Sequence, residues 1–380
     1  MSRLLLLFLL STLPTSLMAE PRKFVRPVSI VLDENGLPIV SVTLHSLKTP
    51  GTSRAFRFIL DTGADWCVVD KSVPSEFFWD DPHTESTARD IADQALPTES
   101  VLLKRVEVGD LTRDGIYAAR MDLQAQMGRF QDQPVDGILG MTFLRGTRFL
   151  LEPNEHRLIW WGYHFSPGAT LPLSTSPGSL PSLPIRMGGQ TVEAEVDTGS
   201  TGGLDLPAAL RPTRTGGKTV SQGVSGVAIA GEIQAISIIE AGGFTWRHAP
   251  VDFQEGTKLG RIGLDVWLAS KVCFDFVTRH VTLTLDKAGN LPLRREPNRR
   301  LPLLWDRSGT VPQLVVALVK PGSPMEKAGC RVGDVLLQAG NLKGRALTRR
   351  AVQDLVASGS RHGWIVLRSG KEVPLTFHAP

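Results

Sequence analysis

The chain has 380 residues, of which 42% are hydrophobic and 21% are charged, so it can form packed cores and is not a disordered polymer. Its 42 Lys and Arg residues against 38 Asp and Glu leave a net charge of +4, too small and too dispersed for a nucleic-acid-binding surface. With three cysteines and no Cys-x-x-Cys, His-Glu-x-x-His, Gly-x-Ser-x-Gly or Gly-x-x-x-x-Gly-Lys motif, zinc enzymes, serine esterases and P-loop hydrolases are disfavoured. We expect no metal, no cofactor and no nucleic-acid partner.

Residues 1–19 have the features of a secretory signal peptide. Arg3 precedes an apolar run from Leu4 to Leu10, and the small residue Ala19 ends the segment. The run is shorter than the about 20 apolar residues that a transmembrane helix requires. We therefore expect an exported protein, periplasmic or secreted, with no membrane span after signal removal. An uncleaved anchor is the alternative.

The rest of the chain has the pattern of a mainly β protein. Short runs rich in Val, Ile, Leu, Thr and Phe alternate with Gly, Pro and Asp. Two proline-rich stretches, 166–184 and 291–302, are typical of linkers. We predict three folded units after the signal peptide, at residues 20–166, 167–290 and 300–380.

The first two units repeat the same features in the same order. In the first, the strand-like run Phe56–Leu60 leads into Asp61-Thr62-Gly63-Ala64, and in the second, Val192–Val196 leads into Asp197-Thr198-Gly199-Ser200. Further on, Ile138-Leu139-Gly140 in the first unit corresponds to Ile262-Gly263 in the second. This ordered repeat indicates a duplication. The plain alternative is that each Asp-Thr-Gly is a polar turn after a strand.

On these motifs, residues from about 28 to 287 resemble the retropepsin-like aspartic proteases, in a single-chain form with two Asp-Thr-Gly lobes. The resemblance implies two β-barrel lobes that hydrolyse polypeptide substrates, with Asp61 and Asp197 as the catalytic pair. It implies that Thr62 and Thr198 cross-link the two loops by hydrogen bonds, and that the glycines let the backbone approach the pair. The residues that would pack beside the catalytic loops are Ile138, Leu139, Gly140, Ile262 and Gly263.

Two carboxyl groups held about 3 Å apart cannot both ionise easily, so they share a proton. The ionised group can then accept a proton from a water molecule, while the protonated group donates a hydrogen bond to the scissile carbonyl. Ser200 follows the second motif where Ala64 follows the first. A Ser200 hydroxyl that donates to Asp197 would favour its ionised form, so we expect the proton to reside more on Asp61.

Two features depart from the pattern of the family. Arg261 stands where the first unit has Ile138, so either the second unit is less regular there or Arg261 pairs with a carboxylate. Gly223, Ser225 and Gly226 suit the tip of a mobile flap, whereas the matching stretch 91–96 has no glycine. A non-catalytic peptide-binding protein that retains the fold is therefore the alternative to an aspartic endopeptidase.

The third unit, residues 300–380, resembles a PDZ domain. Ser323 is placed to cap a short helix that Gly329 ends, and Thr348 begins a second helix. The resemblance implies that the unit binds peptide C-termini by strand addition. We place its carboxylate-binding loop at Ser308, Gly309 and Thr310. A purely structural module is the alternative.

Overall fold

The computed structural model describes residues 26–46, 49–79, 84–89, 94–131, 133–161, 168–174, 180–212, 216–222, 228–294, 301, 303–319, 322–359 and 361–378. The expected signal peptide, residues 1–19, lies outside this part. Within it, the chain is mainly β, as the sequence predicts. None of the helices described is long and apolar enough to cross a membrane.

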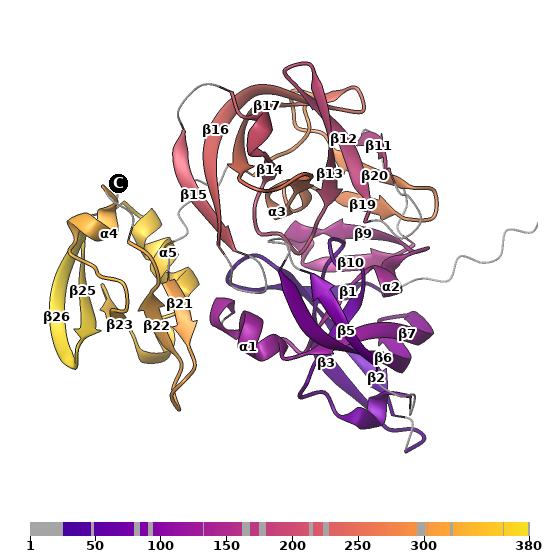
Figure 1. The fold of residues 1–380 in the computed structure, drawn as a ribbon, viewed down its shortest axis with the longest axis horizontal. Helices are drawn as coiled ribbons and strands as arrows, with labels where there is room; N and C mark the ends of the chain where they lie inside the picture. Colours follow the sequence, from indigo (N-terminus) through magenta and orange to yellow (C-terminus); the bar gives the residue numbers. More distant parts are fainter. Residues whose placement is uncertain are drawn as a thin grey trace, which may run out of the picture.

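The described strands form three sheets (Figure 1). The first sheet contains β1 (Val28–Leu32), β2 (Pro38–His45), β3 (Ser53–Leu60), β4 (Cys67–Asp70), β5 (Thr84–Arg89), β6 (Ala95–Val108), β7 (Leu111–Met121), β8 (Gly137–Leu139), β9 (Arg148–Glu152), β10 (Arg157–Trp160), β11 (Gly168–Pro172), β19 (Val272–Asp275) and β20 (His280–Thr284). Pairing of β2 with β6 closes the succession β2-β3-β8-β4-β7-β6 into a barrel, which we call the Asp61 barrel. Two short helices, α1 (Leu123–Met127) and α2 (Met141–Leu144), follow β7 and β8.

The second sheet repeats this arrangement. It contains β12 (Ser182–Met187), β13 (Gln190–Val196), β14 (Leu204–Pro207), β15 (Gly217–Gln222), β16 (Ala228–Ala241), β17 (Phe244–Gln254) and β18 (Gly260–Ile262). Pairing of β12 with β16 closes β12-β13-β18-β14-β17-β16 into the Asp197 barrel. The helix α3 (Leu264–Trp267) follows β18 as α2 follows β8. The strand order matches that of the Asp61 barrel strand for strand.

Three strands connect the two barrels. β11 lies before the Asp197 barrel in the chain, and β19 and β20 follow it, yet all three belong to the first sheet, where β19 pairs with β9. β11 also lies within the stretch 166–184 that the sequence predicts as a linker. It is a strand because its alternate residues Ala169 and Leu171 are fully buried, with β20 as its hydrogen-bonded partner.

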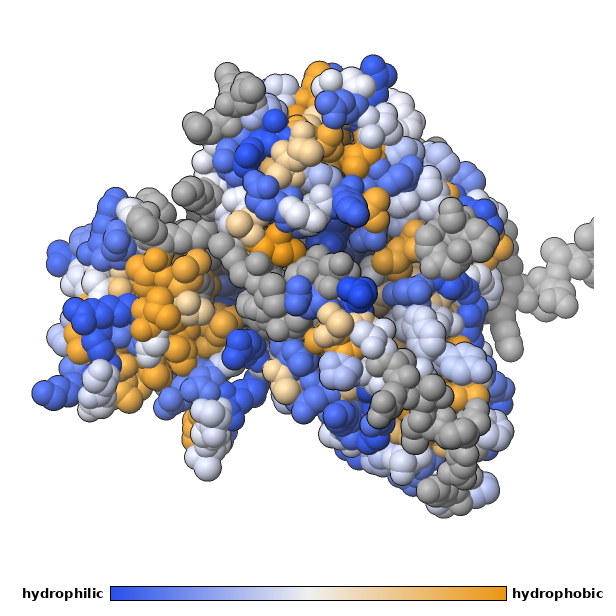
Figure 2. Space-filling view, in the orientation of Figure 1, coloured by the Kyte–Doolittle hydropathy of each residue, from blue (hydrophilic) through white to orange (hydrophobic). Residues whose placement is uncertain are grey.

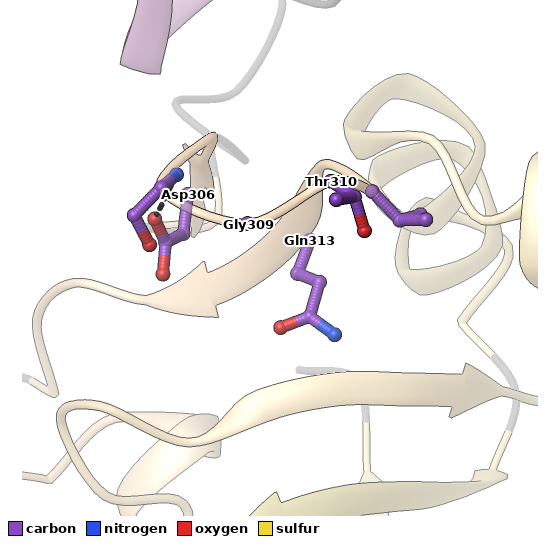
Figure 3. A pocket seen from close by; sticks show the side chains of 6 residues that line it. Asp306, Gly309, Thr310 and Gln313 are labelled. Atoms are coloured by element: carbon purple, nitrogen blue, oxygen red, sulfur yellow. Dashed lines mark hydrogen bonds between the residues drawn. The ribbon is translucent and has the colours of Figure 1, made fainter.

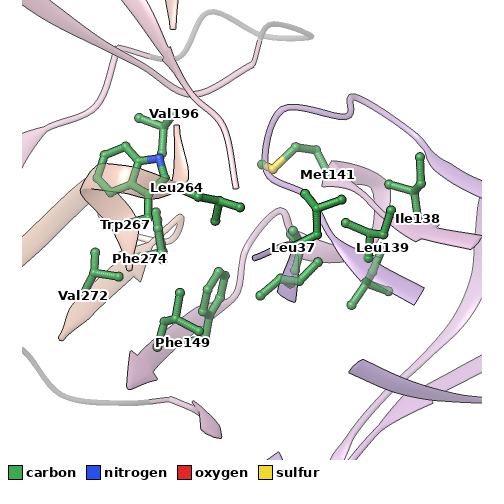
Figure 4. Close-up of a cluster of buried hydrophobic side chains, with 14 of the residues drawn as sticks. Leu37, Ile138, Leu139, Met141, Phe149, Val196, Leu264, Trp267, Val272 and Phe274 are labelled. Carbon is green, nitrogen blue, oxygen red and sulfur yellow. The ribbon is translucent and has the colours of Figure 1, made fainter. Parts of the chain in front are cut away.

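One continuous cluster of buried apolar side chains extends through both barrels (Figure 4). Phe149 of β9 packs against Phe274 of β19 with ring centroids 4.9 Å apart, and Trp267 of α3 packs on Phe274 at 5.4 Å. On the other side of Phe149 lie Leu139 and Met141, beside the first Asp-Thr-Gly loop. Because well-packed interiors resist deformation, this core fixes the position of one loop against the other.

The third sheet contains β21 (Leu303–Asp306), β22 (Gln313–Val316), β23 (Val335–Ala339), β24 (Leu342–Lys343), β25 (Arg361–Arg368) and β26 (Lys371–His378), with helices α4 (Pro324–Lys327) and α5 (Arg349–Ala357). It has its own apolar core. The two helices are capped as the sequence predicts, since the Ser323 and Thr348 side chains accept hydrogen bonds from Glu326 N and Ala351 N.

This module is attached to the Asp61 barrel through buried polar contacts. The Glu34 carboxylate accepts hydrogen bonds from the Trp305 indole and from the backbone N–H of Arg349, both at 2.9 Å. The Arg349 guanidinium lies 3.6 Å from the same carboxylate, and both side chains are almost fully buried. Arg307 donates to the carbonyl oxygens of Gly128 and Gln131.

Candidate active site

The two Asp-Thr-Gly loops meet between the barrels. Asp61 directly follows β3 and Asp197 directly follows β13. A Cβ atom added to Gly63 would lie less than 3.0 Å from the carboxyl carbon of Asp197, and one added to Gly199 would lie equally close to that of Asp61. Each glycine therefore packs against the carboxyl group of the opposite loop, at a distance that no side chain permits. The two carboxyl groups therefore lie next to each other where the loops meet.

The two threonines lock the loops together. The backbone N–H of Thr62 donates to the Thr198 hydroxyl at 3.0 Å, and that of Thr198 donates to the Thr62 hydroxyl at 3.1 Å. Each hydroxyl in turn donates to a carbonyl oxygen at the end of the opposite strand, Val196 for Thr62 and Leu60 for Thr198. Both threonines are fully buried, so these bonds form away from competing water.

Backbone hydrogen bonds orient each carboxyl group. Gly63 N donates to Oδ1 of Asp61 at 2.8 Å, and Gly199 N donates to Oδ1 of Asp197 at 2.7 Å. The same oxygen of each aspartate thus faces its own loop. The equivalence of the two loops follows from the repeated sequence.

The Ile-Leu-Gly and Ile-Gly elements lie beside these loops. Asp61 N donates to the carbonyl of Leu139, and Asp197 N donates to that of Ile262. At Gly140 an added Cβ would collide with the Trp66 carbonyl oxygen, and at Gly263 with that of Gly202. α2 and α3 begin directly after these glycines, where Met141 N donates to Ala64 O and Leu264 N to Ser200 O. The residues expected to pack beside the loops, Ile138 included, are therefore brought to them.

The charges on the two aspartates differ. Burial and the neighbouring charge of Asp197 raise the pKa of Asp61 well above its usual range. On the other side, Nε of Arg261 lies 3.1 Å from Oδ2 of Asp197. The raised pKa favours the protonated form of Asp61, and the Arg261 guanidinium is positioned to stabilise a negative charge on Asp197. No hydrogen bond joins the Ser200 hydroxyl to Asp197 in the described part of the chain.

Arg261 is placed by the register of three strands. It lies opposite Glu195 of β13 and opposite Asp205 of β14, and its Nη1 is 3.8 Å from Oδ2 of Asp205. The sequence left open whether Arg261 pairs with a carboxylate, and the structure supplies two. Asp205 was not a predicted site residue. Its signal was an acidic side chain within the otherwise apolar run Leu204–Pro207, which begins five residues after Gly199.

The expected flap residues Gly223, Ser225 and Gly226 lie outside the described residues. The strands on either side of them, β15 and β16, form an antiparallel hairpin, as do β5 and β6 in the Asp61 barrel.

Ser308, Gly309 and Thr310 lie far from the dyad in sequence and belong to the third module. They line a hollow beside the β21–β22 connection, together with Asp306, Val311 and Gln313 (Figure 3). β22 has hydrogen-bonded neighbours on both sides, so the outer strands of the described sheet are β21 and β26.

In the described residues, no group of three or more His, Cys, Asp or Glu side chains is arranged to hold a metal ion. The dyad itself offers two adjacent carboxyl groups, with the Arg261 guanidinium beside Asp197.

Comparison with protein families agrees with this geometry. Residues 46–143 match the aspartyl protease family. The matched range contains the first Asp-Thr-Gly loop and most of the Asp61 barrel, including Ile138, Leu139 and Gly140. A search of curated proteins finds no match to the chain.

Proposed function

We propose that the protein is an aspartic endopeptidase in which Asp61 and Asp197, one from each lobe of a bilobal unit, activate a water molecule. The observation that carries this proposal is the mutual packing of the two loops, in which each glycine contacts the opposite carboxyl group. A shared proton between the two carboxyls follows from their proximity. The match of residues 46–143 to the aspartyl protease family supports the same reaction class.

In this mechanism, Asp197 is the base because Arg261 stabilises its negative charge. It removes a proton from water as the oxygen attacks the scissile carbonyl carbon. Asp61, which is protonated, donates a hydrogen bond to the carbonyl oxygen as that oxygen becomes negative. When the tetrahedral intermediate collapses, the proton held by Asp197 passes to the amide nitrogen, the C–N bond breaks, and Asp61 keeps its proton. No covalent intermediate forms.

A non-catalytic peptide-binding protein is the second candidate, and Arg261 is the observation that favours it. Its Nε lies beside the Asp197 oxygen that does not face the loop amide, where a reacting water would also bind. An arginine held there permanently would block turnover but leave the binding cleft intact.

We propose further that the protein is exported by its N-terminal signal and that residues 300–380 form a PDZ-like module for peptide C-termini. The hollow lined by Ser308, Gly309 and Thr310 supports the second point. Exposed apolar side chains of this module include Val311 and Val332, and Figure 2 shows apolar surface gathered on this part of the molecule. Binding of peptides with free but not amidated C-termini would support this role; equal binding of both would refute it.

The deciding experiment is digestion of a denatured protein mixture by the full chain between pH 3 and 8. We expect cleavage that is lost in Asp61→Asn and in Asp197→Asn. Asp65→Asn, next to the first loop but half-exposed and paired with Arg145, is the matched control and should retain activity. Cleavage that persists in either dyad variant would refute the mechanism, and peptide binding without cleavage would favour the second candidate.

A further inference from the structure

The two barrels present walls of different chemistry beside the dyad. In the Asp61 barrel, Ile138 of β8 lies in register with Ile59 of β3 and with Val68 of β4. In the Asp197 barrel, the corresponding register positions hold Arg261, Glu195 and Asp205. The three residues that lie side by side on neighbouring strands are therefore all apolar in the first barrel. In the second barrel, the equivalent three residues are two acids and one base. We call this second set the charged wall.

The charged wall faces the dyad. Side chains two residues apart on a strand share a face, so Glu195 lies on the side of β13 that carries Asp197. The intervening Val196 and the preceding Ala194 are fully buried on the opposite face. The contact of Arg261 with Oδ2 of Asp197 places the arginine on the dyad side as well.

The charged wall has more acidic groups than basic ones. Its two carboxylates face one guanidinium, which is also shared with Asp197. The 3.8 Å separation from Asp205 exceeds hydrogen-bonding distance. Burial, with the nearby charge of Asp197, raises the pKa of Glu195 and raises the pKa of Asp205 to about 7. A further cation would relieve this excess of buried negative charge.

We propose that the charged wall is a specificity site that binds a lysine or arginine side chain of the polypeptide substrate beside the scissile bond. The corresponding apolar residues of the first barrel, Ile59, Ile138 and Val68, offer no such charged partner. This inference rests on the proposed endopeptidase function, and it narrows the substrate to polypeptides with a basic side chain beside the scissile bond.

The test uses the full chain and fluorogenic peptides that differ at one position, where Lys is replaced by Met, a side chain of similar length without charge. We expect kcat/KM for the Lys peptide to exceed that for the Met peptide about tenfold. The double variant Glu195→Gln/Asp205→Asn should bring this ratio close to one. Arg261→Met should change it in the opposite direction and raise the ratio, since it removes the only cation of the wall. Glu240→Gln, an exposed acid on the same barrel, is the control and should leave the ratio unchanged.

A ratio depends little on the fraction of enzyme that folds, because both peptides are cleaved by the same preparation. Competition by non-cleavable reduced-amide forms of the same two peptides gives a second measurement that requires no turnover. Cleavage with equal ratios in the native chain and in all variants would overturn the specificity site and leave the endopeptidase proposal standing. Selective binding of the Lys form without cleavage would overturn the endopeptidase and support the wall. Neither cleavage nor binding of any peptide would overturn both.

Discussion

Thr62 and Thr198 are 136 positions apart in the chain, yet the backbone N–H of each donates to the hydroxyl of the other. Thr198→Val keeps the shape of the side chain but leaves the Thr62 N–H and the Leu60 carbonyl without partners. Two buried unsatisfied groups cost about 2–6 kcal/mol, whereas Thr198→Ser keeps both bonds and should cost about 1 kcal/mol. Denaturant unfolding and peptide cleavage by the two variants check this. Equal stability of the Val and Ser variants would contradict it.

Gly63→Ala should reduce cleavage by about 100-fold or more, because the added Cβ collides with the Asp197 carboxyl group and displaces it from the dyad. The matched control is Gly363→Ala, where the added methyl group meets nothing within 4 Å. The measurement is kcat at saturating peptide, together with thermal unfolding of both variants. If Gly63→Ala retained full kcat, the two loops could not be in contact in the working protein.

Arg148 of β9 and Asp275 of β19 form an ion pair where the two barrels are connected. Because of this pair, we expect the free energy of unfolding to decrease at acidic pH. Burial alone would raise the pKa of Asp275, but hydrogen bonds from Thr278 together with Arg148 lower it to about 2, from 3.8. A lowered pKa stabilises the fold at pH values above the unfolded value and loses this effect as pH falls through about 2. We expect Asp275 to contribute about 2 kcal/mol near neutral pH.

Denaturant unfolding of native protein and Asp275→Asn between pH 7 and pH 2 measures this contribution. The two curves should converge as the pH falls below about 3. A constant difference over the whole range would show that Asp275 acts through packing and not through its charge.

Glu34→Ala should release the third module from the Asp61 barrel. The substitution removes the ion-pair partner of the buried Arg349 guanidinium and the acceptor of the Trp305 indole, at a cost of about 3–5 kcal/mol. Limited proteolysis between β20 and β21 and small-angle scattering report release. Glu372→Ala, an exposed acid on β26, serves as the control. An unchanged proteolysis rate and radius of gyration in Glu34→Ala would mean that the remaining contacts, among them those of Arg307, are sufficient to hold the module.

The preference for a basic side chain should depend on pH. The groups that face Asp205 are Arg261, Asp252, Asp197 and Asp265, and burial raises its pKa to about 7. Below this pH Asp205 is neutral and the wall loses one negative charge, so the Lys-to-Met ratio should rise between pH 5 and pH 8.5. In Asp205→Asn the ratio should be flat over that range. A native ratio that falls with pH would contradict this assignment.

The sequence predicts those parts of the site that depend on local pattern. Two Asp-Thr-Gly motifs after strands, each followed by a hydrophobic-Gly element, are sufficient to locate the loops and the residues beside them. The carboxylate partners of Arg261 could not be predicted in this way. They depend on the register of β13, β18 and β14, which no local sequence pattern specifies. For the same reason, the sequence indicated Ser200, which is close to Asp197 in the chain, as the group that would stabilise the charge on Asp197. The structure instead places Arg261, which follows Asp197 by 64 residues, beside the Asp197 carboxyl group.

The fold shows the same limit. The mainly β character and the repeat were predicted, but the prolines around 166–184 indicated a linker where β11 forms. Whether a short apolar run becomes a strand depends on a partner distant in sequence. For β11 that partner is β20, more than one barrel later in the chain.

The attachment of β19 to β9 has a consequence for biosynthesis. A nascent polypeptide that has emerged only as far as β10 presents β9 as an unpaired edge, and the strand that covers it is not made until the whole Asp197 barrel has been translated. During that interval the nascent chain exposes an unpaired strand edge that can form hydrogen bonds with other polypeptides. We therefore expect its yield in cells to depend on translation speed and on chaperone supply more than its final stability would suggest.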